Sequence, residues 1–163
     1  MLLLLTWVGV ALAPGVPPRP PPSCPVAFEL AEKLHPSPLR LSTACAAEVK
    51  LTAAGWERPL VAGALANAWH ESRWNPHAEG DRGRAVGFWQ LHSRGLGKGM
   101  GSDRLDIGIS TDRVIRAADK AGLPDFRFAT PGQASDVFCQ RIMRPDNLSD
   151  NMRKRRRTAA LVN

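Results

Sequence analysis

The residues of this chain that could carry out chemistry gather around one glutamate, Glu71. It stands near the end of the apolar run 60–73, and four aromatic residues lie near it in the sequence: Trp69, Trp74, Phe88 and Trp89. Apolar surroundings favour the protonated form of a carboxyl group, which a general acid working near neutral pH requires. Aromatic ring faces beside such an acid suit a carbohydrate chain. We therefore predict that Glu71 is the proton donor of an enzyme that cleaves glycosidic bonds.

Three blocks of sequence surround or follow this glutamate in a fixed order. The first is Glu-Ser-x-x-Asn-Pro-x-Ala-x-Gly-Asp over residues 71–81, and the second is Gly-Phe-Trp-Gln over residues 87–90. Phe138-Cys139, Arg144-Pro145 and Arg155-Arg156 follow. This set resembles phage tail lysozymes over roughly residues 50–160. It is also similar to the soluble lytic transglycosylases of the lysozyme-like muramidase superfamily, which have Leu-Met where this chain has Phe88-Trp89.

The resemblance implies a peptidoglycan-degrading muramidase that cleaves the bond between N-acetylmuramic acid and N-acetylglucosamine. Glu71 would be the catalytic acid, Ser72 would orient it, and Gln90 would line the substrate groove. Trp89, Phe88 and Trp74 would contact sugar rings. The resemblance further implies a mainly α, lysozyme-like α+β fold, in which a small β-hairpin or irregular lobe at residues 80–90 forms one wall of the cleft.

A second carboxylate would separate two mechanisms. Hydrolases of this kind normally use one, at a distance set by the stereochemical outcome. A lytic transglycosylase needs only Glu71, because the sugar's own 6-hydroxyl group attacks and leaves a 1,6-anhydro end. The candidates for the second carboxylate are Asp106, Asp81 and Glu79, with Asp103 as a further one. We favour Asp106 among them, because it lies outside the glycine-rich turns, and we favour transglycosylation slightly over hydrolysis.

Other catalytic constellations are absent from the sequence. His70 adjoins Glu71, but neighbouring helix residues point about 100° apart, and no His-Glu-x-x-His motif occurs. There is no Gly-x-Ser-x-Gly elbow and no Cys-x-x-Cys pair. We therefore expect no metal and no cofactor.

Hydrophobic spacing and capping residues predict a mainly helical domain over residues 26–163, and the resemblance implies that this domain is lysozyme-like. Ser42 or Thr43 would cap the second helix, and Ser110 or Thr111 the fourth. Thr130-Pro131-Gly132-Gln133 is a capping box that starts the fifth. Residues 95–102 would be a lid or a plain surface loop. The predicted helices are 26–34, 44–54, 60–73, 112–121, 131–143 and 149–162.

The residues before this domain have a different character. Residues 1–16 begin with an uncharged leucine-rich run, which we interpret as a hydrophobic anchor or signal-like segment. Residues 17–25 are rich in proline and predict a semi-rigid spacer. Such a tether fits an enzyme that is virion-associated or membrane-anchored and faces the cell wall. A secreted or periplasmic protein is the alternative. Membrane or virion proteins would be the partners of this segment.

The chain also contains three cysteines and a run of basic residues. Cys24 and Cys45 could form a disulfide in an oxidising compartment, and Cys139 is expected to be an inert core thiol. The net charge is +7, and residues 153–157 read Arg-Lys-Arg-Arg-Arg. We interpret this run as a solvated helix face or a contact to the anionic wall, in preference to nucleic-acid binding, since no nucleic-acid-binding motif accompanies it.

A different class of function stays open at this point. A virion structural or tethering protein could keep a lysozyme-like domain only to bind glycan or partners. The chain has no tyrosine, so it lacks the Ala-Tyr-Asn block of soluble transglycosylases, and this favours the non-catalytic alternative.

Overall fold

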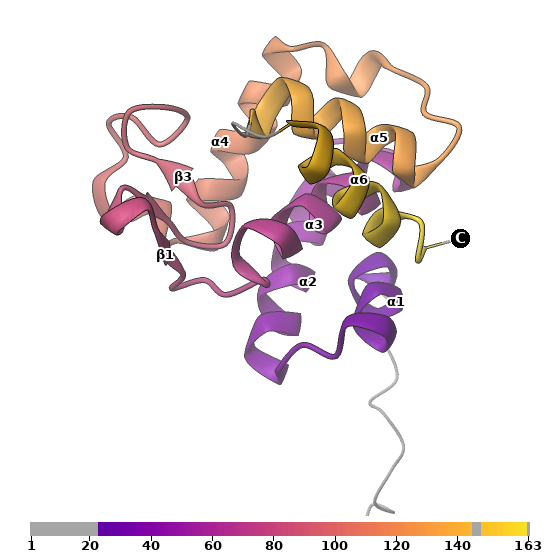
Figure 1. Ribbon diagram of the computed structural model, residues 1–163, viewed down its shortest axis with the longest axis horizontal. Helices are drawn as coiled ribbons and strands as arrows, with labels where there is room; N and C mark the ends of the chain where they lie inside the picture. The colour runs from indigo at the N-terminus through magenta and orange to yellow at the C-terminus, as the bar shows by residue number, and fades with distance from the viewer. Residues whose placement is uncertain (1–22, 145–147, 163) are drawn as a thin grey trace, which may run out of the picture.

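A computed structural model gives the fold, and it describes residues 23–144 and 148–162. Helices form most of it, and a small sheet stands to one side (Figure 1). The predicted mainly α, lysozyme-like α+β class is confirmed. The predicted anchor and most of the predicted spacer lie outside the described residues. The helices are α1 (Pro25–Leu34), α2 (Pro38–Ala53), α3 (Arg58–Ser72), α4 (Ile107–Lys120), α5 (Pro131–Phe138) and α6 (Leu148–Ala159).

Helix α3 runs through the middle of the molecule and packs against α1, α2, α5 and α6 (Figure 1). Eleven of its fifteen residues are buried, as expected for a helix that is apolar on every side. At Gly63 a Cβ atom would lie only 2.6 Å from the backbone nitrogen of Ser135 in α5. The absence of a side chain at Gly63 therefore lets α3 and α5 pack backbone to backbone.

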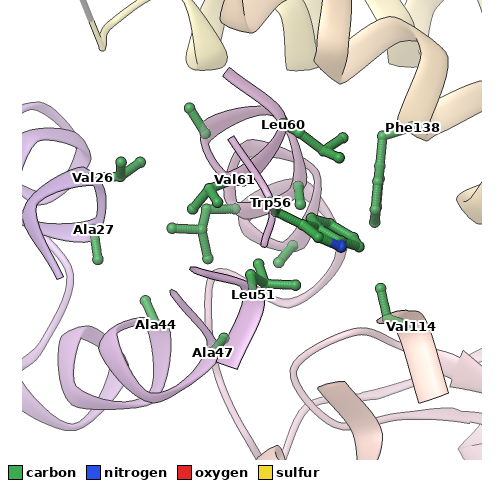
Figure 2. Close-up of a cluster of buried hydrophobic side chains, with 14 of the residues drawn as sticks. Val26, Ala27, Ala44, Ala47, Leu51, Trp56, Leu60, Val61, Val114 and Phe138 are labelled. Atoms are coloured by element: carbon green, nitrogen blue, oxygen red, sulfur yellow. The ribbon is translucent and has the colours of Figure 1, made fainter. Parts of the chain in front are cut away.

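The principal core lies where the two N-terminal helices meet α3, α4 and α5 (Figure 2). A disulfide and two hydrogen bonds also join α1 to α2. A disulfide links Cys24 to Cys45, and the buried carboxylate of Glu48 accepts hydrogen bonds from the backbone N–H groups of Val26 (3.0 Å) and Ala27 (2.6 Å). Glu48 thereby satisfies donors in the first turn of α1 that would otherwise be unpaired. The residues labelled in the core are Val26, Ala27, Ala44, Ala47, Leu51, Trp56, Leu60, Val61, Val114 and Phe138.

The small lobe is a three-stranded antiparallel sheet in the order β1-β2-β3. Its strands are β1 (Glu79–Gly80), β2 (Ala85–Val86) and β3 (Leu91–His92). It lies at the left of Figure 1, away from α1. The lobe predicted at residues 80–90 is therefore a short sheet that extends to His92. A single 3₁₀ turn, Asp81–Gly83, lies between β1 and β2. Two more lie after the sheet, at Gly101–Arg104 and Leu123–Asp125.

Several predicted helix ends are wrong, for local reasons. Helix α2 starts at Pro38, and the hydroxyls of Ser42 and Thr43 donate to the carbonyl of Leu39 inside the helix. Helix α4 starts five residues early, because Asp106 caps it through a hydrogen bond from the N–H of Ile109 (2.8 Å).

Two further ends differ from the prediction. Pro25, assigned to the spacer, is the first residue of α1, since proline suits the first helical turn. The long fifth helix changes at Cys139 into a π-helical turn, Cys139–Met143, and Arg144 ends it in the left-handed region. Across residues 23–144 and 148–162, no helix is both long and apolar enough to cross a bilayer.

Candidate active site

Glu71 is the last residue but one of α3, at the point where the helix leaves the core. The helix ends there because Arg73 and Trp74 take positive φ angles of 55° and 60°. The side chain of Glu71 keeps 21% of its surface exposed. Its carboxylate is therefore half-buried but open to solvent, on an otherwise buried helix.

The partner of Glu71 is Arg155 of α6, 84 residues away in sequence. Its Nη2 donates to Glu71 Oε1 at 2.8 Å, and its Nη1 donates to Asn67 Oδ1 at 2.9 Å. The side chain of Arg155 is only 3% exposed. Within the described residues its Nε has no hydrogen-bond partner. Arg155 thus donates hydrogen bonds to two side chains on one face of α3.

Asn67 is itself fixed in position by hydrogen bonds. Its amide nitrogen donates to the carbonyl of Gly63 (2.8 Å) and to both the carbonyl and the hydroxyl oxygen of Ser135 (3.1 and 3.0 Å). These bonds fix the amide orientation, so that its oxygen faces Arg155. A buried polar network therefore connects α5, α3 and α6 and ends at Glu71.

Ser72 connects the end of α3 to the small lobe. Its hydroxyl lies 2.7 Å from the carbonyl oxygen of Phe88 and 3.2 Å from that of Ala68. It is buried, and its shorter bond goes to the block that precedes β3. Ser72 therefore sets the position of that block relative to the end of α3.

Gln90 stabilises the small lobe and borders a cavity. It has a positive φ of 49°, and its side-chain nitrogen donates to the carbonyls of Ala78 (2.9 Å) and Gly87 (3.0 Å). A Cβ on Gly80 would lie 2.5 Å from its side-chain oxygen. The cavity has a volume of about 780 Å³, and its walls are residues 89–92, 94–96, 117, 120, 121 and 141–144. Glu71 stands outside these walls.

The comparison with protein families decides what this arrangement belongs to. The model of the phage tail lysozyme family matches residues 42–162, most of the chain. The chain belongs to the phage tail lysozyme family. No curated protein and no solved structure matches it. For a phage tail lysozyme the expected activity is of the glycosidase type, and the expected substrate is peptidoglycan.

The aromatic residues predicted to contact sugars lie in the core of this chain. Trp74 and Trp89 are 0% exposed and Phe88 is 1% exposed. The indole N–H groups of Trp74 and Trp89 donate to the carbonyl of Leu65 and the hydroxyl of Thr111. In this arrangement they offer no ring face to a glycan, because core packing covers nearly their whole surface.

The three favoured second carboxylates are not gathered around Glu71 by any interaction within the described residues. Asp106 is the exposed N-cap of α4. Asp81 contacts His92 Nε2 at 2.8 Å and Arg84 Nη2 at 3.1 Å, and the hydrogen bond with His92 is the main cause that lowers the pKa of Asp81. Glu79 lies exposed on β1.

The side chain of His70 contacts α6. Its Nε2 lies 2.8 Å from the hydroxyl of Thr158. Burial, followed by the positive charges of Arg155 and Arg73, lowers the pKa of His70 to about 4. The ring is therefore neutral at neutral pH and serves the packing of α3 against α6. The described residues contain no cluster of His, Cys, Asp and Glu side chains that could hold a metal ion.

Sequence reasoning missed two members of this site, Arg155 and Asn67. The run 153–157 was interpreted as a solvated face, but within it Arg155 is buried and Arg156 pairs with Asp136. A signal for Asn67 was present, since it is a lone polar residue in an alanine-rich run and stands four positions before Glu71, on the same helix face.

Proposed function

We propose that this phage tail lysozyme is a muramidase that cleaves the bond between N-acetylmuramic acid and N-acetylglucosamine, with Glu71 as its general acid. The observation that carries the proposal is the carboxylate itself. It emerges from a buried helix end, keeps part of its surface open to solvent, and is held by a buried arginine. A catalytic acid needs this combination of access and fixed position.

The proposed reaction is a lytic transglycosylation. Glu71 gives its proton to the glycosidic oxygen as the bond from C1 of N-acetylmuramic acid to that oxygen breaks. The 6-hydroxyl oxygen of the same sugar then bonds to C1, and its proton passes to the Glu71 carboxylate. This restores the acid and leaves a 1,6-anhydro end. The engagement of Asp106 in helix capping and of Asp81 with His92 supports a mechanism with one carboxylate.

Arg155 contributes in two ways to this reaction. Its hydrogen bond restricts the rotamers of Glu71, and its positive charge stabilises the ionised carboxylate that accepts the proton of the 6-hydroxyl group in the second step. The bond between Ser72 and Phe88 contributes by keeping the small lobe beside the acid. We propose positioning roles for both residues and for Gln90.

The test is mass spectrometry of fragments released from purified peptidoglycan by the wild-type chain and by Glu71→Gln. We expect 1,6-anhydro products from the wild type and a loss of about 10²–10⁴-fold in the variant. Glu32→Gln is the matched control, because it makes the same change at an exposed position of α1. Reducing ends would indicate hydrolysis, and near-normal activity of Glu71→Gln would refute the role of Glu71.

A virion-associated enzyme that opens the wall during genome entry or release is the biological role that we propose. The family description, which names the phage tail, supports it. The disulfide between Cys24 and Cys45 supports an oxidising environment outside the cytosol, which a secreted or periplasmic protein would share. Immunogold labelling of purified virions separates these locations.

One observation favours a non-catalytic tethering protein as the second candidate. The contact between Glu71 and Arg155 is also what a purely structural ion pair between two helices would look like. Under this hypothesis the wild-type chain co-sediments with peptidoglycan but releases no fragments. In that case Glu71→Gln changes stability alone.

A further inference from the structure

The cavity beside Gln90 has a strongly positive lining. Its walls come from three parts of the chain: β3 with the turn after it, the C-terminal end of α4, and the π-helical turn after α5. No aspartate or glutamate is among the residues described as lining it. Its basic residues are His92, Arg94, Lys120, Arg141 and Arg144.

Most of this charge is not neutralised by the protein. Arg141 donates to the carbonyl of Ala121 (3.0 Å) and lies over the ring of Phe126. Arg94, Lys120 and Arg144 are exposed, and none of them forms an ion pair with another described residue. Gathering like charges around one hollow costs stability through mutual repulsion. An anionic ligand would remove that cost.

The cavity adjoins the end of the catalytic helix. The hydrogen bond from Ser72 fixes the carbonyl of Phe88, and the next residues in the chain, 89–92, form one wall of the cavity. Another wall belongs to the π-helical turn Cys139–Met143 and to Arg144, which follows it. The wall that begins at Trp89 is therefore one residue away from the hydrogen bond that Ser72, the neighbour of Glu71, donates to Phe88.

We infer that this cavity binds the carboxylate groups of the stem peptide that N-acetylmuramic acid carries in peptidoglycan. The inference rests on the proposed function and adds a recognition site for the same substrate. The sugars themselves are neutral hydroxyl and N-acetyl compounds and give no reason for unpaired cations. The stem peptide is attached to the lactyl group of the N-acetylmuramic acid whose C1 forms the scissile bond, and it supplies the carboxylates that the sugars lack.

The test measures binding without cleavage. Isothermal titration calorimetry compares a synthetic stem tetrapeptide that has free carboxylates with the same peptide whose carboxylates are amidated. We expect the full chain to bind the free acid and to lose most of that affinity for the amidated form. The double variant Arg94→Gln/Lys120→Gln should bind the free acid roughly three- to tenfold more weakly, as expected for the loss of two exposed ion pairs.

Arg116→Gln is the matched control, because Arg116 is exposed on α4, one turn before Lys120, and does not line the cavity. It should bind like the wild type. Equal affinity for both peptides, or an equal loss in the control, would overturn the inference. So would failure of the free acid to bind while a short DNA or inorganic phosphate binds at these residues. If Glu71→Gln retains activity but peptide binding behaves as expected, the proposed catalysis fails and the binding site stands.

Discussion

The ion pair of Arg155 with Glu71 places a cation almost completely out of water. Taking charges out of water costs free energy that a single ion pair does not always return. Here the guanidinium group is also bonded to Asn67, which compensates part of that cost. This makes Arg155 the side chain on which the position of Glu71 depends most.

Removing Arg155 should therefore lower the stability of the protein as well as its activity. We expect Arg155→Met to lower the free energy of unfolding by roughly 2–4 kcal/mol, because Glu71 and Asn67 lose their common partner. Urea denaturation followed by circular dichroism measures this. Arg157→Met is the control, since Arg157 is exposed on the same helix and should change stability by less than about 0.5 kcal/mol. Equal effects of both variants would contradict the buried network.

His70 makes stability depend on pH in mildly acidic solution. Its pKa falls from 6.5 to about 4 on folding, so the native state disfavours the charged ring. Stability is complete above pH 6.5 and is lost as the pH falls toward 4. Between about pH 7.5 and pH 5 the loss should be near 2 kcal/mol. Urea midpoints at the two pH values measure it. His70→Gln should flatten this slope, and His77→Gln, an exposed control, should not.

At the scale of the elements, α1 is held mainly by its links to α2. It has ten residues, and a helix this short is marginal in isolation. Its N-cap, Cys24, gives no side-chain hydrogen bond, so Glu48 and the disulfide supply the missing restraint. Burial raises the pKa of Glu48, and its two backbone hydrogen bonds oppose that rise.

Reducing the disulfide should release α1 from this position. The bonded cysteines are 21 residues apart, and opening a loop of that length costs about 3 kcal/mol in the chain-entropy account. We expect thermal unfolding at a lower temperature when a phosphine reductant is present. Cys139→Ser should show the same response to the reductant, since Cys139 is a free, buried thiol. A melting curve that the reductant leaves unchanged would show that packing alone holds α1.

At the scale of the whole molecule, the excess of positive charge predicts long-range attraction to an anionic cell wall. The net charge is +7, and ion pairs such as Lys50–Asp112 and Arg58–Glu29 neutralise only part of the cations. The cavity at the small lobe concentrates some of the remainder. Attraction of this kind is screened by salt.

Binding to the wall should therefore weaken with ionic strength. We expect association with purified sacculi to fall roughly tenfold or more between about 0.05 and 0.5 M sodium chloride. Co-sedimentation of Glu71→Gln with sacculi measures this without cleavage. Binding that is unaffected by salt would mean that contacts with the neutral sugars dominate.

The local sequence determined the elements whose partners lie within a few residues. The hydroxyl of Thr130 accepts from the N–H of Gln133 (3.2 Å), as the capping box predicts. Gly55 takes the left-handed conformation, with φ of 81°, that ends α2. The ordered motif around Glu71 was enough to indicate the family. The cap at Thr130 and the turn at Gly55 follow from the sequence because capping and turn geometry depend on neighbouring residues alone.

Only the tertiary structure decided what surrounds Glu71. Arg155 belongs to a run of five cations, and nothing local distinguishes it from Arg157. It becomes buried because α6 packs against both α3 and α5, which turns this one position of the run inward. In the same way the core took Trp74 and Trp89, although their sequence position also suited a sugar site. Whether a side chain enters the core or the cleft depends on contacts between distant segments. Glu71 and Arg155, for example, are 84 positions apart, and local sequence does not encode how such segments pack.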